Sequence, residues 1–173
     1  LIIHANHFFS PGGGITVLDA EEGVQSQSET VWRQADKYKV PRICFVNKMD
    51  KLGADFLATI KSIEDRLGAN PAIMVLPIGF EDTFKGTVDL LTRTAYIWGS
   101  DELGAKYEMS NEVPEDMKVE VEAFRAKLIE KIAETDDVLM EKFLNGEEPS
   151  VQELKDALRR AVIAHKLVRI YAG

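Results

Sequence analysis

Short apolar runs alternate with helical stretches over the first half of this chain, and this alternation limits the possible folds more than any other feature. Three runs rich in β-favouring residues are predicted to be strands: residues 15–18, 42–46 and 72–76. Two stretches between them are predicted to be helices: residues 27–38 and 56–67. Pro41 stops the first helix and Gly68 closes the second. This β-α-β-α-β order is typical of a parallel α/β sheet.

The second half of the chain follows a different pattern. Two short antiparallel strands are predicted at residues 84–89 and 94–98. Helices are predicted over three further stretches: residues 114–134, 136–144 and 150–165. A last strand covers residues 167–171. The sequence therefore predicts an α/β core, an α+β insertion and one strand that returns to the core.

The charge and the apolar pattern exclude two classes of partner. The formal net charge is −8, whereas wrapping a nucleic-acid backbone requires clustered Lys and Arg. We therefore identify no direct nucleic-acid site. No apolar run approaches the ~20 residues that a membrane helix needs, so no membrane partner is expected. A protein that docks on a ribosome through protein contacts remains compatible with this composition.

Cysteine and histidine content argues against a metal site. Cys44 is the single cysteine and lies in an apolar run, so the chain can form no internal disulfide and no cysteine-based metal site. We interpret Cys44 as a small buried hydrophobe. The three histidines, His4, His7 and His165, show no ligand spacing with carboxylates. No metal ligand is assigned.

The tetrapeptide Asn47-Lys48-Met49-Asp50 is the one motif that implies specific chemistry. It follows the predicted strand 42–46, and ligands of open α/β sheets bind beyond the carboxyl ends of the strands. The two oxygens of Asp50 can accept the N1–H and the N2 amine of guanine. The methylenes of Lys48 can lie against the base, and Asn47 can tie the loop to a neighbouring segment.

Two other interpretations of these motifs were considered. An N-K-x-D match can arise by chance, but a chance match does not require an apolar strand before it and a helix after it. The glycines at 12–14 resemble a phosphate-binding loop, yet they lead into a strand and lack the following Gly-Lys-Ser/Thr. We therefore favour a guanine-reading loop and reject a phosphate loop.

Around this motif the chain resembles elongation factor G. The resemblance is carried by five segments: residues 23–35, 39–50, 53–56, 66–71 and 84–90. It implies an α/β fold with an incomplete P-loop GTPase-type parallel sheet and an α+β insertion subdomain, often called G prime. The implied division is a partial GTPase core with the guanine loop (13–71), the insertion (72–165) and a truncated returning core strand (166–173). Residues 1–12 form an N-terminal segment that matches no known part of the family.

The resemblance implies a fragment of a ribosomal translocase, the GTP-dependent elongation factor that moves tRNA and mRNA. The parent protein would bind GTP or GDP, with Asn47, Lys48 and Asp50 contacting the guanine base. The parent would bind Mg²⁺ through residues that this sequence does not contain. The family's phosphate loop, switch threonine and Asp-x-x-Gly-His loop are also missing, so no catalytic residue is assigned and the chain alone is expected to be inactive.

Three acidic residues near the end of the helix 114–134 have two possible roles. An apolar stripe predicts the buried face of this helix: Met117, Val121, Phe124, Leu128 and Ile132. Glu130 and Glu134 lie opposite it, with Asp137 just beyond. They form either a solvated charged face or, as the resemblance implies, a contact for the ribosomal stalk protein. A monomer in the bacterial cytoplasm, or in an organellar matrix if the source is a eukaryote, is expected.

Other functions were weighed against the translocase. A free-standing stalk-binding module without nucleotide activity would require this chain to fold alone. Release factor 3 and the ribosomal protection proteins are related GTPases, but residues 25–35 and 84–86 favour the elongation factor. An unrelated small α/β enzyme would require a nucleophile, base or metal cluster, which the sequence lacks.

Overall fold

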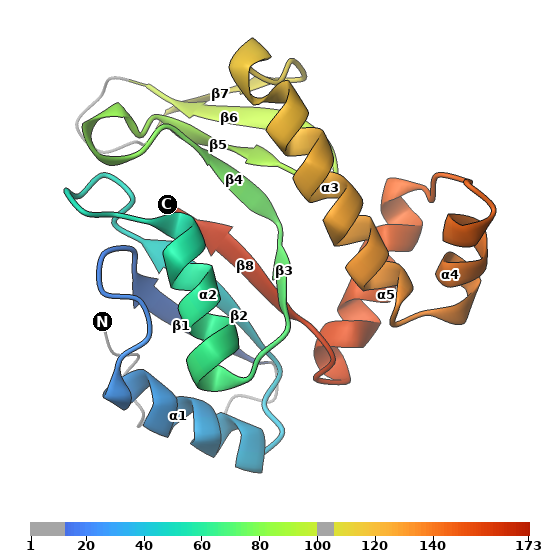
Figure 1. Ribbon diagram of the computed structural model, residues 1–173, viewed down its shortest axis with the longest axis horizontal. Helices are drawn as coiled ribbons and strands as arrows, with labels where there is room; N and C mark the ends of the chain where they lie inside the picture. The colour runs from blue at the N-terminus through green and yellow to red at the C-terminus, as the bar shows by residue number, and fades with distance from the viewer. Residues whose placement is uncertain (1–12, 100–105) are drawn as a thin grey trace.

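The computed structural model describes residues 13–99 and 106–173, which form two sheets flanked by helices (Figure 1). The expected segment 1–12 lies outside these residues. One sheet is parallel, in the order β1-β2-β8-β3: β1 Gly14–Asp19, β2 Arg42–Asn47, β8 Val168–Ala172 and β3 Pro71–Ile73. The other is antiparallel, in the order β4-β5-β6-β7: β4 Val75–Ile78, β5 Gly86–Asp89, β6 Thr94–Trp98 and β7 Tyr107–Ser110. The predicted α/β class with a second, mixed unit is confirmed.

Helices α1 (Ser26–Lys37) and α2 (Phe56–Leu67) cover one face of the parallel sheet. Alternate residues of β2 are fully buried, including Cys44 and Val46, while Ile43 and Phe45 between them are half-buried. This alternation follows from the two-residue period of a strand. The buried side of β2 therefore faces the two helices.

Local capping fixes both ends of α2. The Asp55 carboxylate accepts a hydrogen bond from the Ala58 N–H at 2.9 Å, which satisfies one of the free donors of the first turn. Gly68 ends the helix with φ +61°, a conformation that glycine adopts without steric cost. The helix therefore ends at the glycine that the sequence predicted.

Three helices accompany the antiparallel sheet: α3 Lys118–Ala133, α4 Asp137–Leu144 and α5 Val151–Ile163. The predicted stripe of α3 lies inward, with Val121, Leu128 and Ile132 buried. Helix α5 begins with a capping box between Ser150 and Glu153. Within the described ranges, no helix has the length and apolar character needed to cross a membrane.

A buried arginine holds α3 against the antiparallel sheet. Arg125 is 3% exposed, and one of its terminal nitrogens donates to the Leu90 and Leu91 carbonyls at 2.9 and 3.1 Å. The other donates to Glu148 at 2.6 Å. A buried charge is tolerated when it is paired and hydrogen-bonded in this way. Arg125 thus joins α3, the β5–β6 turn and the segment before α5.

The structure differs from the predicted elements in three places. The single strand expected at 72–76 was wrong: β3 belongs to the parallel sheet and β4 to the antiparallel sheet, with Met74 between them. The Met74 N–H donates to Ile170 of the first sheet, and its carbonyl accepts from Leu90 beside the second. Strand β7 was not predicted. The helix expected from residue 114 begins at Lys118, after a 3₁₀ turn at Glu115–Met117.

Candidate functional site

The predicted guanine loop lies at the carboxyl end of β2, between two other strands of the parallel sheet. Met49 is buried at 1% exposure and anchors the loop, whereas Asp50 is exposed. Lys48 has a positive φ of 66°, and its carbonyl accepts from the Lys51 N–H at 3.1 Å. The chain therefore turns sharply here and presents Asp50 outward while Met49 stays in the core.

Lys48 pairs with an aspartate on the neighbouring strand. Its Nζ donates to Asp19 Oδ2, and Asp19 is the last residue of β1, with 9% exposure. The bond from Lys48 holds the pKa of Asp19 below its ordinary value, although burial acts in the opposite direction. The same bond raises the pKa of Lys48. Both groups are therefore charged at neutral pH.

Backbone hydrogen bonds fix the loop to three other segments. The Ala20 N–H, after β1, donates to the Asn47 carbonyl at 2.9 Å. The Met49 N–H donates to the Gly173 carbonyl, after β8, at 3.3 Å. The Met49 carbonyl accepts from the Glu81 N–H, which belongs to the turn after β4 of the antiparallel sheet, at 2.9 Å. The main chain of Asn47 is therefore tied to the segment that follows β1, and the role predicted for its side chain stays a prediction.

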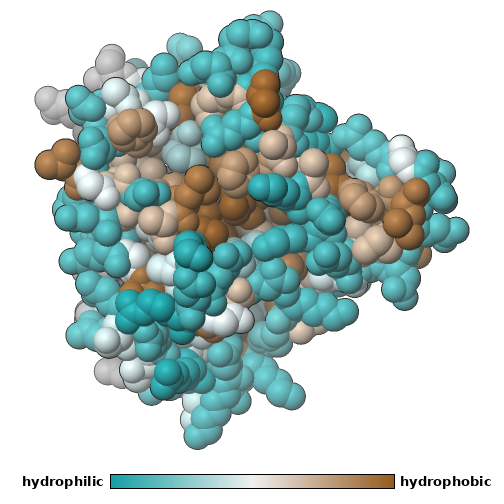
Figure 2. Space-filling view, in the orientation of Figure 1, coloured by the Kyte–Doolittle hydropathy of each residue, from teal (hydrophilic) through white to brown (hydrophobic). Residues whose placement is uncertain are grey.

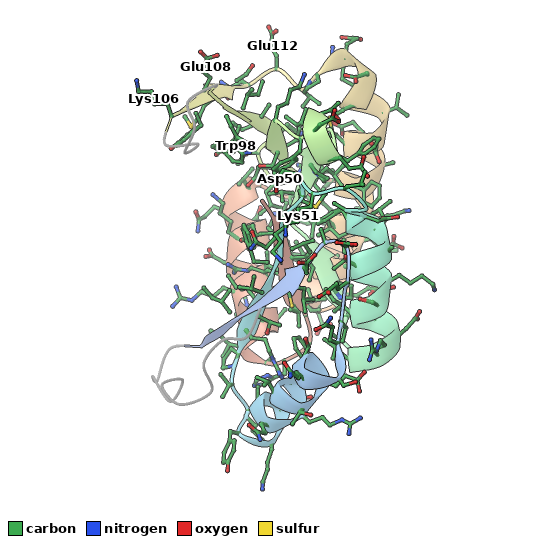
Figure 3. All side chains as sticks on the ribbon, turned by 90° about the vertical axis from the view of Figure 1, so that its left-hand side faces the viewer. Asp50, Lys51, Trp98, Lys106, Glu108 and Glu112 are labelled. Carbon is green, nitrogen blue, oxygen red and sulfur yellow. The ribbon has the colours of Figure 1, made fainter. Side chains whose placement is uncertain are left out.

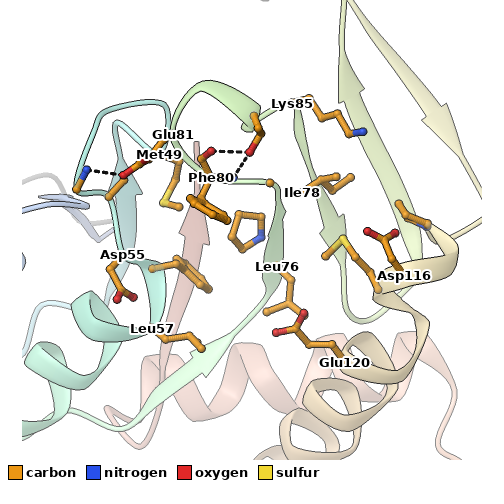
Figure 4. A pocket seen from close by; sticks show the side chains of 18 residues that line it. Met49, Asp55, Leu57, Leu76, Ile78, Phe80, Glu81, Lys85, Asp116 and Glu120 are labelled. Carbon is orange, nitrogen blue, oxygen red and sulfur yellow. Dashed lines mark hydrogen bonds between the residues drawn. The ribbon is translucent and has the colours of Figure 1, made fainter.

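A side chain of the second sheet also reaches this loop. Glu81 lies in a 3₁₀ turn, η1 (Glu81–Thr83), between β4 and β5. Its Oε1 accepts from the Gly53 N–H at 2.8 Å, a bond drawn in Figure 4. Figure 3 shows Asp50 and Lys51 at the upper end of the parallel strands, below the part of the antiparallel sheet that carries Trp98 and Lys106. The candidate site thus lies where the two sheets meet.

The loop fits a purine base better than a metal ion. Asp50 offers two carboxylate oxygens at the surface, and the ammonium of Lys48, two residues before it, is directed to Asp19. Over residues 13–99 and 106–173, no group of three or more His, Cys, Asp and Glu is placed to hold a metal. Burial raises the pKa of the Cys44 thiol to about 12, so that thiol is no nucleophile at neutral pH.

A groove of about 780 Å³ runs beside the loop. Apolar side chains from the loop, α2, β4 and the start of α3 line its floor: Met49, Leu57, Leu76, Ile78, Phe80 and Met117. Acidic side chains also line it: Asp55, Glu81, Asp116 and Glu120. Figure 2 shows apolar side chains gathered on this surface between α2 and α3. The groove separates the guanine loop from α3.

The three predicted stalk-contact residues lie elsewhere. Glu130, Glu134 and Asp137 are all exposed, at the end of α3 and the start of α4. In Figure 1 this corner lies on the far side of the molecule from the β2–α2 loop. The structure therefore brings Asn47, Lys48 and Asp50 together in one turn and keeps the acidic group apart from them.

Two residues of the site were missed by the sequence analysis. Asp19 directly follows the predicted strand 15–18 and was given no role, although its position at the end of a strand beside β2 is a usable signal. Glu81 carried no local signal, because its contact with Gly53 joins residues of different sheets. Both were found only once the sheets were assembled.

Comparison with known proteins gives the family. The family model of the elongation factor Tu GTP binding domain matches residues 7–165. Elongation factor G 1 of Bdellovibrio bacteriovorus is 54% identical over 161 residues, which is 93% of this chain and 23% of that protein. A crystal structure of a protein from Thermus thermophilus is 30% identical with a TM-score of 0.81, again covering 93% of this chain and 23% of the other.

This chain thus spans less than a quarter of the length of each of these relatives. The matches nevertheless cover almost all of the chain, including the β2–α2 loop and most of the second sheet. They confirm the resemblance to part of elongation factor G that the motifs indicated, and the chain belongs to the family of the elongation factor Tu GTP binding domain.

Proposed function

We propose that the protein of which this chain forms part is a GTP-dependent translation elongation factor, a ribosomal translocase. One observation carries the proposal: Asp50 is exposed at the end of a parallel strand, in a turn tied by backbone bonds to three other segments. Such a fixed carboxylate is suited to reading one edge of a purine. Family membership and the relative named elongation factor G support the biological role.

In this proposal, Asp50 accepts the N1–H and the N2 amine of guanine. Adenine lacks the amine and has an acceptor at N1, so it would leave the carboxylate unpaired. Sites that depend on such polar pairing discriminate strongly. The stem of Lys48 covers one face of the guanine, with its ammonium fixed by Asp19. Asn47 holds the start of the turn in place.

GTP or GDP is the proposed ligand of the complete protein, with Mg²⁺ bound by other residues. The 173 residues contain no Gly-Lys-Ser/Thr phosphate loop, so no step involving Mg²⁺ or the phosphates is derived from this chain. Residues 13–71 and 166–173 would belong to the GTPase core and residues 72–165 to the insertion. The change of sheet at Met74 supports a boundary near this point.

The acidic corner formed by Glu130, Glu134 and Asp137 supports a second proposed role, docking of the ribosomal stalk protein. All three carboxylates are exposed at the junction of α3 and α4. A monomer acting on the ribosome in the bacterial cytoplasm, or in an organellar matrix if the source is a eukaryote, is the proposed setting. No nucleic-acid or membrane site is proposed.

Asp50→Asn in the complete protein tests the guanine assignment. The amide cannot accept both guanine donors, so affinity for GDP is expected to fall about 100-fold or more. Affinity for the xanthine nucleotide is expected to rise, because the amide can donate to the carbonyl at C2 of xanthine. Competition binding of GDP and XDP measures both changes.

Asp82→Asn is the matched control, because Asp82 is an exposed carboxylate outside the loop. It should leave both affinities unchanged. If the Asp50→Asn protein binds GDP with wild-type affinity, Asp50 does not contact the guanine base as proposed.

A further inference from the structure

Glu81, in the turn after β4 of the antiparallel sheet, makes two hydrogen bonds to the guanine loop. Its N–H donates to the Met49 carbonyl at 2.9 Å, and its carboxylate accepts from the Gly53 N–H at 2.8 Å. These two points bracket the tip that carries Asp50. We propose that Glu81 is a positioning residue for guanine recognition, which fixes the orientation of Asp50 and so sets base selectivity from the second sheet. This inference rests on the proposed function of the loop.

The tip of the loop has few contacts of its own. Asp50 and Lys51 are exposed, and Leu52 is 82% exposed. Gly53 has φ +85°, so the chain reverses at a residue with little intrinsic preference for one conformation. Within the tip, the Lys51 N–H donates to the Lys48 carbonyl and the Ala54 N–H to the Lys51 carbonyl, both at 3.1 Å. Glu81 adds one bond from the other sheet near each end of the tip.

The turn that presents Glu81 is itself braced. Glu81 has φ +51°, an unfavourable region for a non-glycine residue that persists only where the surroundings impose it. The Phe80 N–H donates to Thr83 Oγ1 at 3.1 Å, and that hydroxyl donates to the Phe80 carbonyl at 2.7 Å. A Cβ at Gly79 would lie 2.2 Å from the Thr83 carbonyl oxygen, so only glycine allows this close turn. The turn is a rigid support for Glu81.

A purely structural role makes a different prediction from a positioning role. If Glu81 only linked the two sheets, its loss would lower thermal stability and weaken the binding of every nucleotide to the same extent. If it positions Asp50, its loss will mainly weaken the binding of nucleotides that use both oxygens of Asp50. GDP offers the N1–H and the 2-amino group, whereas IDP offers only the N1–H. The ratio of their affinities therefore reports the position of the carboxylate.

The experiment measures GDP and IDP affinity and the GDP dissociation rate in the complete protein. Glu81→Ala is expected to weaken GDP binding roughly 3- to 10-fold, as for loss of one hydrogen bond, and to weaken IDP binding less. Glu81→Gln retains an acceptor for the Gly53 N–H and should restore the wild-type ratio. The neighbouring exposed Asp82→Ala is the control and should change nothing.

Glu81→Asp guards against a folding defect in the alanine variant. Aspartate tolerates positive φ better than glutamate, but its carboxylate is one methylene too short to reach Gly53. It should therefore show the same fall in the GDP-to-IDP ratio with an unchanged melting temperature. An unchanged ratio in Glu81→Asp overturns the positioning role, whatever the alanine variant does.

Asp50→Asn, measured in parallel, separates this inference from the proposed function. In one outcome, Asp50→Asn loses affinity for GDP and gains affinity for XDP, while the Glu81 variants keep the wild-type ratio of GDP to IDP affinity. The loop then recognises guanine, and only the role of Glu81 is refuted. If Asp50→Asn binds GDP as the wild type does, the guanine assignment itself is refuted and the role of Glu81 is refuted with it.

Discussion

At the scale of single residues, the carboxylates of this chain differ in what stabilises their charge. Asp19 is buried; it is paired with Lys48 and also accepts a hydrogen bond from the Glu21 N–H at 3.0 Å. Glu153 accepts from the Ser150 N–H at 2.9 Å, the Ser150 hydroxyl at 2.8 Å and Lys142 Nζ at 2.5 Å. Hydrogen bonds to the charged form favour that form. Asp50, by contrast, is exposed and free to meet a ligand.

The pH dependence of stability should report the bonds to Glu153. The hydrogen bond from Lys142, followed by those from Ser150, lowers the pKa of Glu153 to about 2 from an ordinary 4.5. Because the pKa is depressed in the folded state, this carboxylate contributes its full stability above pH 4.5 and loses it as the pH falls toward 2. Glu153→Gln should lower the melting temperature by about 1–3 °C at pH 7.

Thermal unfolding of the chain between pH 2 and pH 7 measures this difference. The gap between wild type and Glu153→Gln should close toward pH 2. Glu141→Gln, an exposed carboxylate of α4, is the control and should show no gap at any pH. A gap that stays constant with pH would mean that the charge of Glu153 contributes nothing.

At the scale of elements, the sequence predicts what local chemistry determines. The ends of α2 were predictable because Asp55 and Gly68 act within one turn of the helix. The change of sheet at Met74 was not, because an uninterrupted apolar run does not reveal which partner strand each half will meet. Strand β7 was missed because it is short and mostly exposed, so the alternation of Tyr107 and Met109 with polar neighbours covers only four residues. Pairing with β6 alone makes it a strand.

The candidate site divides in the same way. One short motif contains Asn47, Lys48 and Asp50. Its chemistry can be recognised from the residue types and from the strand before it. Asp19 and Glu81 act across strands and sheets, so their partners depend on the sheet order. The sequence therefore predicted the group proposed to read the base, and the structure was needed to find the groups that hold it.

Stalk docking is proposed for the α3–α4 corner, and charge changes at this corner test it. The triple variant Glu130→Lys, Glu134→Lys, Asp137→Asn removes or reverses three exposed charges while Ile132 and Ala133 beneath them stay buried. Exposed ion pairs contribute about 0.2–1 kcal/mol each, so affinity for the C-terminal domain of the stalk protein should fall roughly 10-fold. Titration at two salt concentrations measures this fall and its electrostatic origin.

A charge reversal on another element controls for the position of the changed charges. Glu108→Lys lies on β7, on a different part of the surface, and should leave stalk affinity unchanged (Figure 3). Equal affinity of the triple variant and the wild type would leave the acidic corner as an ordinary solvated face.

At the scale of the whole molecule, the two sheets have separate proposed tasks and are connected at more than one place. The parallel sheet presents the guanine loop, and the insertion carries the acidic corner at the far end of α3. Glu81 and the change of sheet at Met74 connect the two units beside the groove. The proposed binding of a base at the loop would therefore involve residues of both units.

Hydrolysis of GTP makes a demand that these residues do not meet. Phosphoryl transfer is accelerated by groups that position the attacking water and stabilise charge on the phosphates. Contacts to the guanine edge are equal in the ground and transition states, so they contribute binding but no acceleration. The 173 residues contain no Gly-Lys-Ser/Thr loop.

The purified chain should therefore release no phosphate from GTP above a buffer blank, in an assay where the complete protein on ribosomes gives multiple turnovers. Activity in the chain that persists in Asp50→Ala would identify a contaminating enzyme, whereas activity that Asp50→Ala abolishes would contradict the prediction and place catalytic groups within this chain.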